Sequence, residues 1–417
     1  MWRITEGGSI THSIIHDGVV YFNSCDRHVY AVDCDTWEEK WRFKTGEIIT
    51  AMPAVKDGVV YAGSHDGKFY AIDASDGREI WRFNAGSEIF SGACVHNGMV
   101  FFGCRSGYFY ALNLKGKEMW RFKTGDEIVF NPIAYEDKIF VGSFDKNIYC
   151  LNLDGKELWR FRTGDCVHAD ISPLISGNII YFASFDNYLY ALDISDGKEV
   201  WRFKTGKYGN ASSPVIHKNV IYHGSRDGIL YAISLDGEEL WRFRTGGMIE
   251  APPLIYDNVI YVSSEDGNVY FLTLEGKEFG RFKTGGAIYT SPKIYKNVLY
   301  VGSWDCHLYA IDTKGKELWR FNTSSLMPAS IPPAHEIFKM EIDKAVDFET
   351  TEEEDRYKIS RGEIISLSDY HVTSEYSTKS EYKQKSDYDV NLVMFEEVLV
   401  VSPDISQGSL LTFERKA

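Results

Sequence analysis

The sequence predicts an all-β fold, an eight-bladed β-propeller of four-stranded antiparallel blades that is followed by a β-rich C-terminal extension. Two observations support this prediction. A Trp-Arg dipeptide or a close variant returns every 39 to 42 residues, and each interval contains four short β-branched or aromatic runs. A period of this length is typical of repeat architectures, in which each unit buries its faces against its neighbours. The recurring positions are Trp2, Trp41, Trp81, Trp120, Trp159, Trp201, Trp241, Gly280 where a Trp is expected, and Trp319.

The unit that ends at residue 83 shows what one repeat contains. Its four apolar runs are separated by three Asp-Gly pairs, which are Asp57-Gly58, Asp66-Gly67 and Asp76-Gly77. Asp-Gly between such runs predicts β-hairpins, because type I′ turns need a positive φ at both central residues. Residues 1–323 show no sustained helical periodicity. Each unit is therefore predicted to be a four-stranded antiparallel meander.

Eight such meanders fit the radial arrangement of a propeller, which leaves only short, protected strand edges. A β-sandwich is the alternative all-β solution, but it would not need a nearly identical sequence in every unit. The sequence leaves open how the ring closes. Either Trp2 or Trp319 belongs to the last strand of the eighth blade.

The end of each repeat, as in Gly155-Lys156-Glu157-Leu158-Trp159-Arg160-Phe161, resembles the tryptophan-docking repeat of the PQQ-like β-propellers. That family includes quinoprotein alcohol dehydrogenases and a propeller lipoprotein of outer-membrane assembly. The resemblance covers residues 3–323 and implies the fold, but not the function, since one propeller can carry enzymes or scaffolds. It implies that an outer-strand Trp docks on the next blade at Trp41, Trp81, Trp120, Trp159, Trp201, Trp241 and Trp319.

Aromatic burial gives a physical reason for such docking, because a ring of this size buries about 150–250 Å². We expect Gly280 to leave the weakest junction between blades, unless Phe279 fills the space. The Arg that follows each Trp should point to the opposite side of its strand and form a solvated rim.

The chain divides into three predicted parts: the propeller (1–323), a linker with three prolines (324–335) and an acidic, β-rich segment of no recognised family (336–417). In the last part, Ser-Asp-Tyr or Ser-Glu-Tyr recurs every six residues, which would place all four Tyr on one face of an extended strand. We interpret this stretch as an edge strand or hairpin with an aromatic stripe. The alternative is a segment that binds a partner or is modified. The four residues are Tyr370, Tyr376, Tyr382 and Tyr388.

Composition excludes several classes of function. The net charge is −15 and no basic face is concentrated anywhere, which argues against nucleic-acid binding. The sequence contains no run of 18 apolar residues that would predict a membrane-spanning helix, so we expect no membrane insertion. The first seven residues lack the features of a signal peptide. Seven irregularly spaced cysteines favour a reducing compartment, and we therefore expect a cytoplasmic location. We also expect a monomer that binds other proteins.

Catalytic signals are missing. The PQQ enzymes that the repeat resembles carry adjacent cysteines, a Ca²⁺ held by Glu, Asn and Asp, and long insertions around the cofactor. This chain has no adjacent cysteine pair, and its loops are short. Neither PQQ nor Ca²⁺ is therefore predicted as a cofactor, and no residue is predicted to be catalytic.

Two sets of turn residues are candidates for metal or ligand binding. His28, His65 and His307 lie in neighbouring positions of blades one, two and eight, and could form a metal or anion site; the alternative is that each only packs locally. An Asp recurs in seven of the eight turns between the second and third strands. It either forms the turn through its own backbone or contributes to a ring of carboxylates that binds a ligand.

Departures from the repeat indicate where binding occurs. The loop between blades spans seven residues, from its Gly to the residue aligned with the next Pro, in six repeats, but nine from Gly164 to Pro173 and eight from Gly206 to Pro214. These loops open on the face where propellers usually bind ligands, and neutral drift in loop length is the alternative. The predicted binding residues are Asp165, His168 and Asp170, Tyr208 and Asn210, and at related positions Glu250, Tyr289 and His12.

These observations favour a non-catalytic scaffold that binds proteins through the loops of one face and through the C-terminal segment. The alternative is a small-ligand or metal-binding propeller, a quinoprotein-like enzyme or receptor, that uses the central funnel. Asp165, His168 and Asp170 are a second possible metal set for that alternative.

Overall fold

The computed structural model describes residues 8–167 and 172–323, together with five short strands nearer the C-terminus. The chain forms two compact units, one of residues 7–331 and one of residues 1–6 with 332–417. The second unit contains the sheet β33 (Phe348–Thr350), β34 (Arg356–Ile359) and β35 (Ile364–Ser366), and the pair β36 (Leu399–Val401) and β37 (Phe413–Arg415). Within the described residues there is no helix that is long and apolar enough to cross a membrane.

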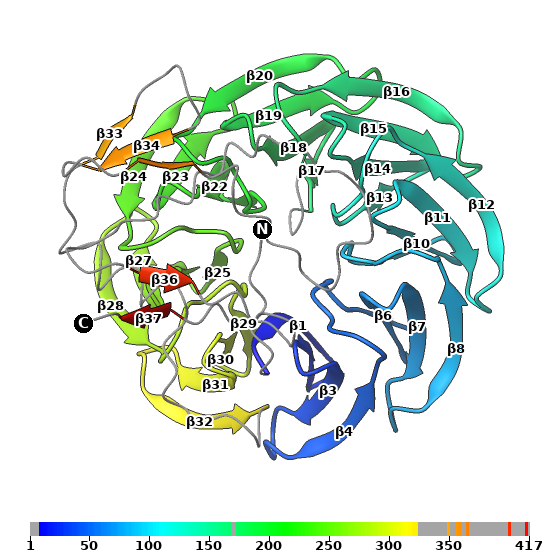
Figure 1. The fold of residues 1–417 in the computed structure, drawn as a ribbon, viewed down its shortest axis with the longest axis horizontal. Helices are drawn as coiled ribbons and strands as arrows, with labels where there is room; N and C mark the ends of the chain where they lie inside the picture. Colours follow the sequence, from blue (N-terminus) through cyan, green and yellow to red (C-terminus); the bar gives the residue numbers. More distant parts are fainter. Residues whose placement is uncertain are drawn as a thin grey trace. The chain divides into compact units, whose positions relative to one another are not determined.

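The larger unit is a ring of eight four-stranded antiparallel sheets, which confirms the predicted eight-bladed propeller (Figure 1). Each blade is built from four consecutive strands, the first near the centre of the ring and the fourth at its periphery.

The first four blades have these bounds: blade 1, β1 (Ile10–His16), β2 (Val19–Ser24), β3 (His28–Asp33) and β4 (Glu39–Lys44); blade 2, β5 (Ala54–Lys56), β6 (Val59–Gly63), β7 (Lys68–Asp73) and β8 (Glu79–Asn84); blade 3, β9 (Cys94–His96), β10 (Met99–Gly103), β11 (Tyr108–Asn113) and β12 (Glu118–Lys123); blade 4, β13 (Ile133–Tyr135), β14 (Lys138–Gly142), β15 (Asn147–Asn152) and β16 (Glu157–Arg162).

The other four continue the pattern: blade 5, β17 (Leu174–Ser176), β18 (Ile179–Ser184), β19 (Tyr188–Asp193) and β20 (Glu199–Lys204); blade 6, β21 (Val215–His217), β22 (Val220–Gly224), β23 (Ile229–Ser234) and β24 (Glu239–Arg244); blade 7, β25 (Leu254–Tyr256), β26 (Val259–Ser263), β27 (Asn268–Thr273) and β28 (Glu278–Lys283); blade 8, β29 (Lys293–Tyr295), β30 (Val298–Gly302), β31 (His307–Asp312) and β32 (Glu317–Asn322).

The ring closes without exchange of a strand, because Trp319 lies in β32 and completes blade 8. Blades 8 and 1 are joined by side chains instead. The hydroxyl of Tyr300 donates to the carbonyl of Cys34 at 2.9 Å, and Lys296 pairs with Asp35 at 2.8 Å. Trp37 stacks on Trp319 with ring centroids 6.0 Å apart. The position of Trp2 lies outside the described residues.

Local sequence explains the blades. The Asp-Gly turn at Asp57 and Gly58 has φ values of 50° and 74°, the conformation that a tight hairpin requires. Second and third strands are buried on both faces and are accordingly continuous apolar runs. The outer strand instead alternates between inward and exposed residues. The core is therefore a set of apolar clusters between successive blades, which together cover all eight junctions.

The outer-strand indoles lie against the next blade at six junctions. In each, Nε1 donates to a backbone carbonyl in the turn before the next outer strand, as Trp120 does to Leu153 at 2.8 Å. A Gly in that turn lies under the ring; a Cβ on Gly155 would come within 2.6 Å of Trp120. The six donors are Trp41, Trp81, Trp120, Trp159, Trp201 and Trp241.

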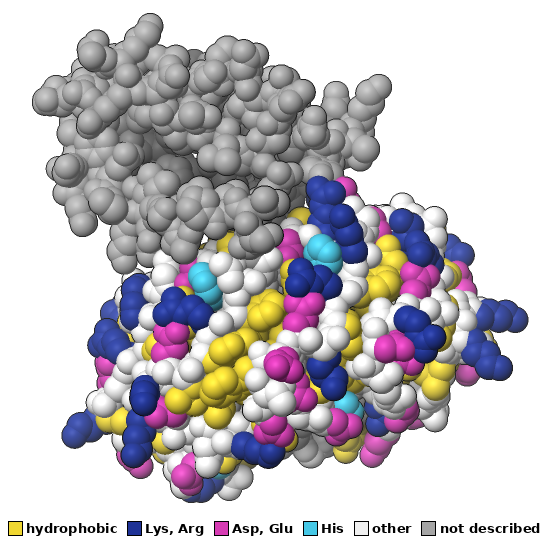
Figure 2. Space-filling model, turned by 90° about the horizontal axis from the view of Figure 1, so that it is seen from below, with side chains coloured by type: hydrophobic (Ala, Val, Ile, Leu, Met, Phe, Trp, Pro, Cys, Tyr) yellow, Lys and Arg dark blue, Asp and Glu magenta, His cyan; other side chains and the backbone are white. Residues whose placement is uncertain are grey.

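The Arg after each Trp has a more specific role than the solvated rim that we expected. In seven blades, Nε and Nη2 of this Arg donate to both oxygens of the Glu three residues earlier, as in Arg42 and Glu39. The guanidinium also lies over the ring of a core Tyr, 5.2 Å from the centroid of Tyr30 in blade 1. Figure 2 shows basic and acidic side chains lying among apolar ones on one side of the molecule.

Candidate functional site: the loop face of the ring

Two kinds of connection lie at the same end of every blade, because the strands are antiparallel. They are the turn between the second and third strands and the loop that leads from the fourth strand to the next blade. We call the surface that they form the loop face. Among the predicted binding residues that the structure describes, Asp165, Tyr208, Asn210, Glu250 and Tyr289 belong to its interblade loops.

One position of the loop face varies in chemistry although its backbone is constant. It is the second residue of the turn between the second and third strands. In most blades its N–H donates to the carbonyl of a neighbouring interblade loop, as from Phe144 to Glu127 at 2.9 Å and from Trp304 to Ala287 at 3.0 Å. We call these eight residues the variable ring: Cys25, His65, Arg105, Phe144, Phe185, Arg226, Glu265 and Trp304.

The Asp that follows the variable position is a structural residue. Asp66 accepts hydrogen bonds from the N–H of Lys68 at 2.9 Å, the hydroxyl of Tyr70 at 2.5 Å and, from the preceding blade, the N–H of Gly46 at 3.0 Å. Burial raises the pKa of this carboxyl, but these hydrogen bonds outweigh it and leave the pKa below its usual value. The same pattern joins blades at Asp145, Asp186, Asp227, Asp266 and Asp305. These geometries favour the turn-forming role over a carboxylate ring for ligands.

Blade 3 departs from this pattern in two places. Ser106 replaces the Asp, and Ala85 replaces the Thr that precedes the Gly in most interblade loops. The hydroxyl of Tyr110, which has lost its carboxylate acceptor, donates to the carbonyl of Ala85 at 3.3 Å.

Arg226 connects three blades on the loop face. Its Nε lies 2.8 Å from a carboxylate oxygen of Glu250, and both side chains are largely buried. Its guanidinium lies 5.3 Å from the ring centroid of Phe185, and Nη1 donates to the carbonyl of Tyr208 at 3.4 Å. Glu250 is thus an ion-pair partner of Arg226, a residue that the sequence prediction did not include.

Tyr208 is the most exposed large apolar residue of the described chain, at 65%. Its φ of 84° is unusual for a residue other than Gly. The loop beneath it is fixed, because Gly209 N–H donates to Asn187 Oδ1 at 2.8 Å. Asn210 is fully buried and accepts a hydrogen bond from Thr205 Oγ1 at 3.0 Å. Asn210 therefore holds the loop in place, whereas Tyr208 projects from it.

Tyr289 belongs to a neighbouring cluster on the same face. Its ring centroid lies 4.4 Å from that of Trp304. Burial, together with the charges of Glu265 and Glu250, raises the pKa of the Tyr289 hydroxyl above its usual range. This phenol consequently stays protonated at physiological pH and can donate a hydrogen bond.

A second Arg–Phe arrangement lies across the ring in blades 2 and 3. Arg105 pairs with Glu88 at 2.6 Å and with Glu127 at 3.1 Å, and it lies over Phe90. His65 contacts the same Phe90 ring, with centroids 3.9 Å apart. Burial, with a smaller contribution from Arg105, lowers the pKa of His65 to about 3, so that His65 is neutral at physiological pH.

The remaining predicted residues have local partners or lie outside the description. His12 Nδ1 is 2.8 Å from the carbonyl of Thr50, and Asp165 lies 3.4 Å from Lys146. His168 and Asp170 lie outside the described residues.

The structure does not bring the three candidate metal ligands together. His28 and His307 each use Nδ1 near the carbonyl of their own turn Asp, and His65 uses Nε2 with Thr50 Oγ1. Across residues 8–167 and 172–323, no three His, Cys, Asp or Glu side chains are grouped as metal ligands. The geometry therefore gives no support to a metal site at His28, His65 and His307.

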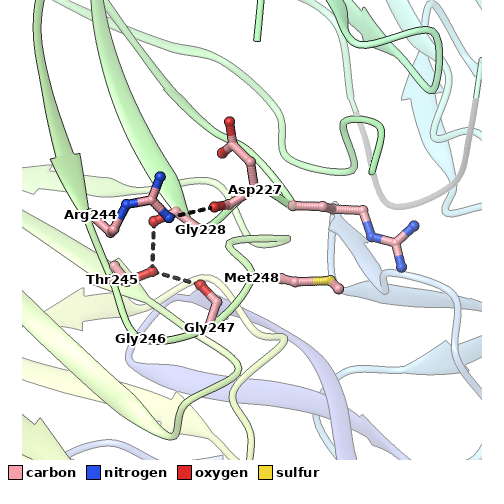
Figure 3. A pocket seen from close by; sticks show the side chains of 8 residues that line it. Asp227, Gly228, Arg244, Thr245, Gly246, Gly247 and Met248 are labelled. Atoms are coloured by element: carbon pink, nitrogen blue, oxygen red, sulfur yellow. Dashed lines mark hydrogen bonds between the residues drawn. The ribbon is translucent and has the colours of Figure 1, made fainter. Parts of the chain in front are cut away.

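A polar pocket of about 190 Å³ lies beside Arg226, between blades 6 and 7. Its lining includes Arg226, Arg244, Gly247 and Met248. In Figure 3, Arg244 donates to the backbone carbonyl of Asp227, at 3.2 Å, and Met248 extends away from Arg244. Gly247 packs closely against blade 7, because a Cβ there would lie 2.6 Å from the N atom of Asp266.

Comparisons with known proteins agree with this architecture. A family model described as outer membrane protein assembly factor BamB matches residues 25–129, 105–241, 208–279 and 226–416. Among solved structures, the computationally designed Ika8 protein is similar at 17% identity with a TM-score of 0.64, and BamB from Moraxella catarrhalis at 21% with 0.63. Each alignment covers 72% of this chain and 95% of the other, and at these identities the likeness concerns the fold. No curated protein matches the chain.

Proposed function

The chain belongs to the PQQ-like β-propeller repeat family, and from this premise we propose that it is a non-catalytic scaffold that binds partner proteins through its loop face. The C-terminal segment 336–417 provides a second contact surface in this proposal. The proposal rests on the variable ring. The side chain at this position differs between blades in size, charge and aromaticity, whereas its backbone N–H makes the same hydrogen bond in most blades.

Recognition surfaces of other proteins combine the same two features, a constant backbone and variable side chains. A rigid scaffold presents variable side chains, among which aromatic residues and Arg contribute most of the binding energy. Phe144, Phe185, Trp304, Arg105 and Arg226 supply those residue types here. An enzyme of the quinoprotein kind would instead need a cofactor pocket, and we propose that neither PQQ nor Ca²⁺ is bound.

The test is affinity capture with the purified full-length chain as bait. The double variant Phe185→Ser with Tyr208→Gly removes two aromatic residues from the loop face. Leu240→Ser is the matched control, because Leu240 is 53% exposed on outer strand β24, away from that face. We expect the double variant to lose partners that the wild type and the control retain. Its melting temperature should fall, because Phe185 is only 8% exposed, but the variant should stay folded at the temperature of the capture. Equal capture by all three proteins would contradict the proposal.

Two further measurements address the other expectations. A thermal-shift assay with PQQ, Ca²⁺ and Zn²⁺ should show no stabilisation, and a clear shift would favour the small-ligand alternative. We propose a cytoplasmic location because all seven cysteines are unpaired. Cell fractionation followed by immunoblotting tests this location, and recovery of the chain in the membrane fraction would contradict it.

A further inference from the structure

The pocket beside Arg244 and the exposed Tyr208 lie next to each other on the loop face. Arg226 links them, since it lines the pocket and donates to the carbonyl of Tyr208. Tyr208, Phe185, Arg226 and Arg244 therefore form one continuous surface across blades 5 and 6, which we call the Tyr208 patch.

The charge of the pocket decides which ligand it accepts. The carboxylate of Asp227 already has hydrogen-bond partners within the protein, because it accepts from the N–H of Gly206 at 2.8 Å and from the Tyr231 hydroxyl at 2.6 Å. Glu250 neutralises Arg226. Within the described part of the chain, no carboxylate lies within 4 Å of the Arg244 guanidinium, so its positive charge is the one left for a ligand. A guanidinium in this state binds carboxylates through charge-assisted hydrogen bonds.

The equivalent positions between blades 7 and 8 carry different charges. Gly286 occupies the position of Gly247, but Glu265 replaces Arg226 and Lys283 replaces Arg244. In blades 1, 3 and 4 the residue at the position of Gly247 is acidic, namely Glu47, Asp126 and Asp165. The combination of a Gly at this position with two Arg side chains is therefore found at one junction among those that the structure describes.

Tyr208 supplies the apolar half of the surface. Its positive φ is an unfavourable conformation, of about 1 kcal/mol or more, that the hydrogen bonds of Asn187 and Asn210 maintain. An exposed aromatic ring on a fixed loop loses little conformational entropy on binding, which makes it an effective anchor.

We propose that the Tyr208 patch binds an acidic peptide segment of a partner protein, in which a carboxylate side chain pairs with Arg244 and an adjacent aromatic side chain packs on Tyr208. This inference rests on the proposed function and names the partner's chemistry.

Fluorescence anisotropy with three labelled Gly-Ser octapeptides tests the ligand. They carry a central Asp-Phe, Asn-Phe or Asp-Ala pair. We expect the Asp-Phe peptide to bind the full-length chain at least fivefold more tightly than the other two. Its binding should weaken as salt rises from 0.05 to 0.5 M, since screening weakens a carboxylate–guanidinium contact.

Three variants test the site. Arg244→Asn introduces an Asn, which blades 2 and 8 have at this position as Asn84 and Asn322. This variant should bind the Asp-Phe peptide at least fivefold more weakly. Arg162→Asn makes the same change in blade 4 and should leave binding unchanged. Tyr208→Gly should also weaken binding at least fivefold. Its melting temperature should stay equal or rise, because Gly relieves the positive φ, and a role in folding alone would give the opposite.

The inference is wrong if no peptide binds at concentrations up to 1 mM, if the Asn-Phe peptide binds as well as the Asp-Phe peptide, or if Arg244→Asn binds like the wild type. Partner capture that is lost in the double variant would then still support the scaffold. Capture that is unaffected would remove both conclusions.

Discussion

Phe271 lies directly opposite Gly280 on strands β27 and β28. In the other blades the same pair joins a small residue on the third strand to a Trp on the fourth, as in Ala71 and Trp81. Blade 7 has the large and the small partner exchanged. Phe271 is fully buried and lies over Gly315, the turn Gly of blade 8, as the indoles do at six other junctions. Phe279 stays 54% exposed, so the junction is filled by Phe271 and not by Phe279.

This exchange predicts strong coupling between the two positions. Phe271→Ala alone should lower the free energy of unfolding by about 3–5 kcal/mol, because it leaves a cavity at the junction. Gly280→Trp alone should cost about 1–3 kcal/mol, since a Cβ at this position already lies 3.2 Å from Phe271. The double variant should recover most of both losses, and urea denaturation of the four proteins measures the coupling. Additive losses would show that Phe271 does not replace the indole.

Removal of a docked indole should be costly at an ordinary junction as well. Trp120→Ala deletes the ring on Gly155 and the hydrogen bond to the Leu153 carbonyl. We expect a loss of about 3–5 kcal/mol in the free energy of unfolding. A loss under about 1 kcal/mol in denaturant unfolding would show that the Trp120 indole does not hold blades 3 and 4 together.

The turn Gly beneath each indole gives an independent test. Gly155 has a φ of 78° and would place a Cβ 2.6 Å from Trp120, whereas Gly98 has a φ of 73° with no atom within 4 Å of such a Cβ. Gly98→Ala measures the cost of the backbone conformation alone, about 1–2 kcal/mol. Gly155→Ala should cost more, because the indole must also move. Equal melting temperatures for the two variants would contradict close contact between Gly155 and the ring.

The sequence predicted the blade number and the strand order because both follow from one period and its Asp-Gly turns. It could not predict the exchange at blade 7, since Phe271 looks like one more apolar strand residue until its cross-strand partner is known. The Glu–Arg pairs were missed for a similar reason. Strict alternation separates residues three apart onto opposite faces. In blade 1, however, the outer strand has one extra residue between Glu39 and Trp41, the partners of Val32 and Ala31, and this register shift brings Glu39 beside Arg42.

The candidate site was predicted less completely. Loop length identified Tyr208, because an insertion is visible in the sequence. Arg226 and Phe185 lie in turns of ordinary length, so length carried no signal for them. A comparison of the middle residue in the eight turns between second and third strands, seven of which read Ser-x-Asp, would have found both. Asn210 shows the limit of loop position as a criterion, because a polar residue in an inserted loop can be fully buried.

His223 predicts how stability changes with pH. It lies in β22 and is fully buried, and neither ring nitrogen has a hydrogen-bond partner among the described residues. Burial lowers its pKa from 6.5 to about 4, although the charge of Asp227 opposes this shift. Above pH 6.5 the imidazole is neutral in both the folded and the unfolded chain. Between pH 6.5 and 4 only the unfolded chain gains the proton, so the folded state loses stability as the pH falls.

The loss should reach about 3 kcal/mol at pH 4, and His223→Val should remove it. Valine is the matched replacement, because Val262 and Val301 occupy this position in blades 7 and 8. Differential scanning calorimetry at pH 7, 5.5 and 4 should show that the melting temperature of the wild type falls more steeply than that of the variant. His65 titrates in both proteins and cancels in the comparison. Parallel curves for the two proteins would mean that His223 is protonated as easily in the folded chain as in water.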